Sequence, residues 1–179
     1  LEMDAAVSQY FPEFDGKIQR KVLHGDADAI YEFLNDGLAE LGQLGEVYIS
    51  EQMKRVQVLN TPAFSMGLSL KSGLLELTLD SPELSMEELA EVLTRYNRRK
   101  KYYRLKNGSF LNMQDTQMNN LVEMVDGLQL SARQLKSGKI LIPQYRALYL
   151  DSLSHEEGAE YIHRDHSFKQ LVRNMRSME

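Results

Sequence analysis

The sequence predicts an α+β fold in which a short antiparallel sheet with two β-hairpins is packed by several helices. Residues 66–70 and 75–79 alternate between large apolar side chains and smaller or polar ones around a turn at 71–73, as paired strands do. Asn107-Gly108 separates two further strand-like arms, and this dipeptide is a strong signal for a two-residue hairpin turn with positive φ at both positions. Elsewhere apolar residues recur at helical spacing behind capping residues, which favours helices packed on a sheet.

In the first part of the chain we expect two helices and three short strands. The first helix lies within residues 3–11. The second is capped by Asp26 or Asp28, carries apolar residues at helical spacing, and is ended by Gly42 and Gly45. The expected strands cover residues 17–23, with Ile18 and Val22 on one face, then 46–49 and 55–59.

The rest of the chain starts with the hairpin at 66–79, which we place at the centre of the sheet. Ser85 and Glu88 then form an S-x-x-E capping box before an apolar run, which predicts a helix through about residue 98. Asp115 is expected to cap the next helix. The remaining elements are a hairpin with arms at 102–106 and 109–113, a strand at 140–142 ended by Pro143, a helix at 145–153, a linker and strand after 155–158, and a final helix from near Ser167.

Charge is distributed unevenly along the sequence. The chain has a formal net charge of −5, yet seven cations lie in one short stretch, and the remaining residues carry −12 without them. Tyrosines and a phenylalanine are interleaved with these cations, a pattern typical of nucleic-acid-binding surfaces. Such a stretch attracts polyanions or an acidic protein surface, but cations also gather at a helix C-terminus to meet its dipole. The seven residues are Arg95, Arg98, Arg99, Lys100, Lys101, Arg104 and Lys106.

Composition and missing motifs restrict the function. The 179 residues hold no cysteine, which excludes disulfides and thiolate metal sites and fits a reducing cytoplasm, where we expect this protein. No apolar run approaches the roughly 20 residues that cross a bilayer, so no membrane role is expected. The phosphate-binding loop, dinucleotide-binding and nucleophile-elbow motifs are absent, so we predict no catalytic residues. His163 and His166 lack a third ligand at a recognised spacing, so we predict no metal site.

Five ordered blocks of the sequence carry a resemblance to a known family. They are GEVYIS at 45–50, SGLLEL at 72–77, RRKKYYRLKNGSFLNM at 98–113, KILIPQYRALYLD at 139–151 and RDHSFKQLVRNMR at 164–176. Together they resemble the helicase-associated region of bacterial SNF2-type (SWI/SNF family) ATPases. In that family the region precedes two RecA-like motor lobes.

The resemblance implies a parent protein similar to an ATP-dependent DNA helicase or translocase. ATP and Mg²⁺ would then bind the motor beyond Glu179, and this part of the chain would hold no cofactor. The first residue is Leu1, which also suggests a piece of a longer protein. We expect residues 1–16 to be a tail or the end of an upstream element, 17–163 to form the helicase-associated domain, and 164–179 to form a helix leading to the motor lobes.

Two hypotheses for function follow. In the first, the chain is a non-catalytic accessory domain that supports the motor lobes and contacts the backbone of double-stranded DNA through the seven cations. In the second, it is a regulatory module that docks on the motor lobes without binding DNA, and the same cations bind an acidic surface of the motor and restrain closure of its lobes. One apolar face of the final helix is the expected interface with a motor lobe, through which the first hypothesis has the chain hold the motor. Its residues are Phe168, Leu171, Val172 and Met175.

Overall fold

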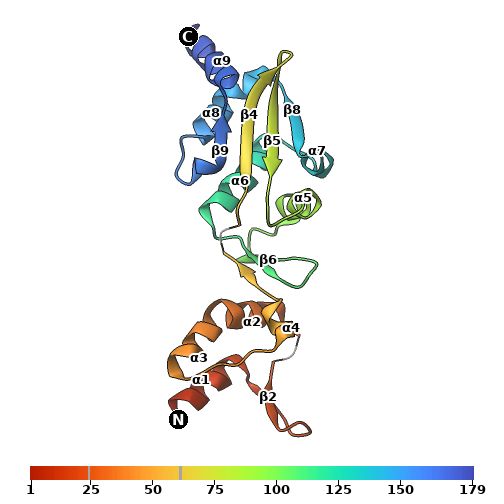
Figure 1. The fold of residues 1–179 in the computed structure, drawn as a ribbon, viewed down its shortest axis with the longest axis vertical. Coiled ribbons are helices and arrows are strands. Elements are labelled where there is room, and N and C mark those ends of the chain that lie inside the picture. Colours follow the sequence, from red (N-terminus) through yellow and green to blue (C-terminus); the bar gives the residue numbers. More distant parts are fainter. Residues whose placement is uncertain (24, 61) are drawn as a thin grey trace. The chain divides into compact units, whose positions relative to one another are not determined.

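The computed structural model describes residues 1–23, 25–60 and 62–179 and divides the chain into two compact units (Figure 1). Unit 1 comprises Leu1–Leu59 with Arg104–Leu111, and unit 2 comprises Asn60–Tyr103 with Asn112–Glu179. Both contain helices and small sheets, which confirms the predicted α+β class. No finding tests the predicted boundaries at residues 16 and 163, so they stay predictions.

Unit 1 is mainly helical. Asp26 caps its long helical segment, because the Asp26 carboxylate accepts a hydrogen bond from Asp28 N at 3.0 Å. A π-helical turn interrupts this segment, and its Gly37 lies so close to Phe33 that a Cβ would approach the ring to 2.8 Å. The elements are α1 (Glu2–Tyr10), β1 (Glu13–Asp15), β2 (Arg20–Val22), α2 (Ala27–Glu32), η1 (Phe33–Gly37), α3 (Leu38–Leu44), α4 (Glu51–Lys54) and β3 (Val58–Leu59).

The strands of unit 1 differ from those predicted. Strand 17–23 is reduced to β2, which pairs antiparallel with β1, and Ile18 lies exposed in the turn between them. The reason is Asp15, whose carboxylate accepts from Lys17 N at 2.8 Å and so favours a turn. Residues 46–49 form no strand, and the strand expected at 55–59 is only β3. Ser50 caps α4 by accepting from Met53 N, and this helix takes up the chain between those two segments.

Unit 2 contains a four-stranded sheet of β4 (Ser65–Lys71), β5 (Leu74–Asp80), β8 (Lys139–Ile142) and β9 (Ile162–Arg164). Their order is β8-β5-β4-β9, so the predicted hairpin is central, as expected. Ser72 and Gly73 form its turn with φ of 51° and 79°, as a two-residue hairpin requires. The pairings of β5 with β4 and β8 are antiparallel, as predicted, but β9 runs parallel to β4 after the chain returns through helices, which differs from the predicted antiparallel arrangement at this edge.

Seven helices complete the described part of unit 2, and the side chains of Ser85, Asp115, Ser131 and Asp165 cap the N-termini of four of them. Ser85 accepts from Glu88 N at 3.1 Å and Asp115 accepts from Met118 N at 3.1 Å, as predicted. The full reciprocal capping box, however, is formed by Ser131 with Gln134. The helices are α5 (Met86–Arg95), α6 (Thr116–Gly127), α7 (Ala132–Lys136), η2 (Gln144–Arg146), α8 (Ala147–Leu153), η3 (Ala159–Tyr161) and α9 (His166–Arg176).

A second hairpin consists of β6 (Tyr102–Arg104) and β7 (Phe110–Asn112), in a three-stranded sheet of order β3-β7-β6. The hairpin was predicted correctly, but its turn type was not. Gly108 N donates to Leu105 O at 3.0 Å, so the turn spans four residues, and of its two central residues neither has positive φ. Gly108 follows them with φ of 88°, while Ser109 N donates to the Asn107 side chain at 2.9 Å. Asn107 thus supports the turn through its side chain, and its backbone does not adopt a left-handed conformation.

Replacing Gly108 with valine should lower the free energy of unfolding by about 1–2 kcal/mol, because a β-branched residue is strained at this φ. The new Cβ would meet nothing closer than Val56 Cγ2 at 4.0 Å. The loss of stability would therefore come from the strained backbone and not from a steric clash. Urea denaturation measures it. Gly16→Val is the control, since Gly16 also lies in a turn but without positive φ and with open space around it. Equal costs for the two variants would show that φ at Gly108 is not what matters.

Candidate functional site

The basic segment is the set of seven cations from Arg95 to Lys106, and most of it lies beyond the helix. α5 ends at Arg95, so only this residue is in the last turn. The attraction of cations to the helix C-terminus therefore accounts for one of the seven. All seven side chains are exposed.

A closed loop at 96–101 presents the middle of the basic segment. Asn97 O accepts from Lys100 N at 2.9 Å, and the Asn97 side chain accepts from Arg99 N at 3.0 Å. The Tyr96 hydroxyl donates to Lys100 O, and burial of the Tyr96 ring raises the pKa of its hydroxyl above the ordinary value. These bonds fix the loop backbone, so its cationic side chains project from a defined turn.

The loop borders a shallow depression of about 390 Å³. Four consecutive cations contribute to its lining, and amide side chains from the start of α6 and the residues before it add further donors. This combination of ammonium, guanidinium and amide donors suits phosphate oxygens. These amides were not predicted as site residues from the sequence, although they flank the helix cap at Asp115. The lining residues are Tyr96, Arg98, Arg99, Lys100, Lys101, Met113, Gln114 and Asn119.

Arg98, which lines this depression, has a carboxylate partner. The Arg98 guanidinium donates to the Asp126 carboxylate, and both side chains are exposed. Within the described part of the chain, no ion pair holds Arg99 or Lys101. These two cations are therefore the ones best placed to meet an external anion.

The structure does not gather all seven cations into one unit. Arg95 and residues 98–101 belong to unit 2, whereas Arg104 and Lys106 belong to unit 1. The Arg104 guanidinium lies 4.9 Å from the centre of the Phe110 ring, which is a cation–π contact. The candidate site is consequently the depression formed by residues 98–101 and their neighbours, and the roles of Arg104 and Lys106 in anion binding stay predictions.

The apolar face of α9 is only partly covered. Phe168 and Val172 are 0% and 6% exposed, but Leu171 and Met175 are half-buried. Part of this apolar face is therefore accessible to another surface. Which surface meets the remaining apolar area stays a prediction.

Asp165 fixes the start of α9. Burial acts to raise the pKa of its carboxyl, but hydrogen bonds from Ser167 Oγ at 2.6 Å and Phe168 N at 2.8 Å outweigh it and hold the pKa below the ordinary value. The cap thus stabilises α9 at neutral pH, and this contribution is lost as the pH falls through the lowered pKa. Ser167 Oγ also accepts from Leu70 N at 2.9 Å, which ties α9 to β4.

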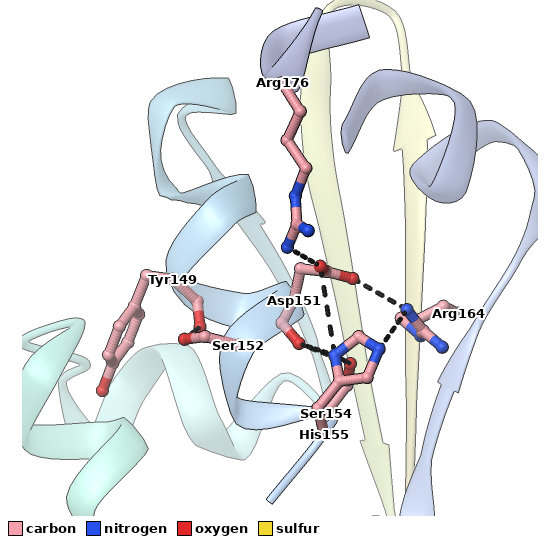
Figure 2. Close-up of polar contacts among 7 residues, drawn as sticks. All are labelled: Tyr149, Asp151, Ser152, Ser154, His155, Arg164 and Arg176. Atoms are coloured by element: carbon pink, nitrogen blue, oxygen red, sulfur yellow. Dashed lines mark hydrogen bonds and ion pairs between the residues drawn. The ribbon is translucent and has the colours of Figure 1, made fainter. Parts of the chain in front are cut away.

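A buried carboxylate in unit 2 forms a second polar cluster that the sequence analysis missed (Figure 2). Asp151 on α8 accepts from Arg164 Nη1 and Arg176 Nη2, both at 2.8 Å, and His155 Nδ1 lies 2.7 Å from Asp151 O. The available signal was an aspartate within the apolar helical run ALYLDSL. Such a residue, when buried, needs partners.

Neither a metal site nor a membrane span is found in the described ranges. No group of three potential ligands lies together there, and His163 and His166 are both exposed. No helix among these residues is long and apolar enough to cross a bilayer.

Comparison with known protein families shows to which family this chain belongs. A family model described as bacterial SNF2 helicase associated matches residues 3–179. The chain belongs to this family. The match covers all the elements described above except Glu2 of α1, and the resemblance to the bacterial SNF2 helicase-associated family inferred from the sequence blocks is confirmed. No curated protein and no solved structure matches the chain.

Proposed function

We propose that this chain is a non-catalytic accessory domain of an SNF2-type ATPase and that it contacts the backbone of double-stranded DNA through the depression at residues 98–101. The parent would be a cytoplasmic ATP-dependent DNA helicase or translocase whose motor lobes bind ATP and Mg²⁺. One observation carries the DNA contact: four consecutive exposed cations border one depression in a chain whose formal net charge is −5.

Electrostatics determines the kind of binding that this site supports. Cations that meet phosphates release condensed counterions, so the affinity should fall steeply as salt rises. The loop offers no helix or strand that would enter a groove to read base edges, so binding should be independent of sequence. Because the rest of the chain is acidic, we expect an affinity in the non-specific range of roughly 10⁻⁴–10⁻⁶ M.

The test is the double variant Arg99→Glu/Lys101→Glu. Both side chains are exposed, so the fold should be unchanged, while the affinity for a duplex should fall at least about tenfold and to the same extent for unrelated duplex sequences. Fluorescence anisotropy with a labelled duplex at several salt concentrations measures this. Arg133→Glu/Lys136→Glu on α7 is the matched control, since it makes the same change in net charge at exposed positions outside the depression.

A second function, docking on the motor lobes without DNA binding, is favoured by the partly covered face of α9. The same experiment separates the two. If the unmodified chain fails to bind duplex DNA at low salt but binds the isolated motor lobes of its parent, the DNA proposal is wrong and the docking function stands. A loss of affinity as large in the control as in the Arg99/Lys101 variant would also contradict the proposed site, because net charge alone would then explain it.

A further inference from the structure

A second positively charged depression, of about 370 Å³, lies in unit 2 among α8, β9 and α9. Four cationic side chains, one histidine and a single carboxylate line it, so cations outnumber the carboxylate even with the histidine neutral. None of these charged residues belongs to the basic segment or to the apolar face of α9. The lining residues are Asp151, His155, Arg164, Lys169, Val172, Arg173 and Arg176.

Asp151 orients two of these cations. Asp151 is 3% exposed, and its two carboxylate oxygens accept from Arg164 and Arg176 at 2.8 Å each (Figure 2). A guanidinium has five N–H donors, and each of these bonds uses one. Both guanidinium groups are thus held in place with most of their donors still available. The Asp151 carboxylate faces these two groups and is buried from solvent.

The remaining cations raise the positive potential without a carboxylate of their own. Lys169 and Arg173 are exposed and lie four residues apart on α9, and Arg176 follows three residues later. Like charges at this spacing destabilise a helix. Across the residues the structure describes, no ion pair holds Lys169 or Arg173. An anion in the depression would relieve the repulsion between them.

We propose that this depression, the Asp151 pocket, binds a phosphate group. Guanidinium groups match phosphate oxygens through paired N–H donors, and two that are already oriented lose less freedom on binding. Lys169 would add a mobile ammonium at the edge. The site shares no residue with the depression at 98–101, so it goes beyond the proposed DNA contact and does not depend on it.

The probe that tests the site is inorganic phosphate, titrated at constant ionic strength and followed by amide and side-chain NMR shifts of the whole chain. We expect saturable shifts confined to the pocket residues. Lys169→Ala/Arg173→Ala should weaken binding at least about tenfold, because it removes two of the four cations while leaving the Asp151 bonds intact. Arg133→Ala/Lys136→Ala, with the same change in charge, should leave the affinity unchanged.

Two competitors identify the source of the phosphate group. Displacement of inorganic phosphate by a short duplex without terminal phosphates would assign the pocket to a nucleic-acid backbone. Displacement only by a nucleoside monophosphate would assign it to a phosphomonoester, and either result supports the pocket. Arg99→Glu/Lys101→Glu should retain phosphate binding even if DNA binding is lost. Shifts that never saturate, or that weaken equally in the α7 control, would overturn the proposal.

Discussion

Replacing Phe168 with alanine is expected to lower the free energy of unfolding by about 3–5 kcal/mol, as truncation of a fully buried aromatic residue does. Phe168 has no exposed surface, and α9 packs on both β4 and α8. The variant leaves a cavity at the place where the last helix joins the central sheet. Urea denaturation monitored by circular dichroism measures the loss.

The same helix provides the matched comparison. Leu171→Ala/Met175→Ala truncates the two half-buried members of the apolar face, so its cost should be clearly smaller than that of Phe168→Ala. If the face meets a motor lobe, this double variant should nevertheless weaken binding to the isolated lobes. A cost as large as that of Phe168→Ala would show that the whole face is core. Unchanged affinity for the lobes would remove α9 as their interface.

Elements specified by local patterns were predicted well. The hairpin of β4 and β5 follows from leucines at every second position, with Leu75, Leu77 and Leu79 all buried. The helices α5 and α6 follow from a capping residue and an apolar period of helical spacing, and α9 follows from its apolar period. In these cases the residues that fix an element lie within or next to it.

Elements that depend on a partner or on one side-chain bond were predicted poorly. Residues 46–49 have an apolar, strand-like composition but no strand pairs with them, and composition does not reveal a missing partner. β9 was expected, but its parallel pairing with β4 depends on the path of the intervening chain. At the second hairpin, the bond from Ser109 N to Asn107 decides the turn, and the dipeptide alone does not show it.

The two candidate sites also differ in how far they depend on local sequence. Residues 98–101 are consecutive, so the sequence itself brings their charges together. The structure adds that these residues lie beyond the C-terminus of α5. The Asp151 pocket combines residues from α8, β9 and α9 that are up to 25 positions apart. No local pattern links them, so this pocket could not be predicted before the packing of unit 2 was known.

Asp151→Asn should lower the free energy of unfolding by about 2–3 kcal/mol. Asparagine has the same size, but it is neutral and its NH₂ group is a donor, so it can no longer accept from both Arg164 and Arg176. The ion pairs that join α8 to β9 and to α9 would be lost. The cost stays below that of a fully buried pair because the side chains of Arg164 and Arg176 are 27% and 59% exposed and regain some hydration.

Asp126→Asn is the matched control, since it breaks the ion pair with Arg98 between two exposed side chains. Its cost should be below about 1 kcal/mol and should shrink further in high salt, which screens exposed charges more than buried ones. Urea denaturation of both variants at low and high salt separates the two cases. A loss at Asp151 that is no larger than that at Asp126, and equally sensitive to salt, would mean that the buried carboxylate does not hold α8, β9 and α9 together.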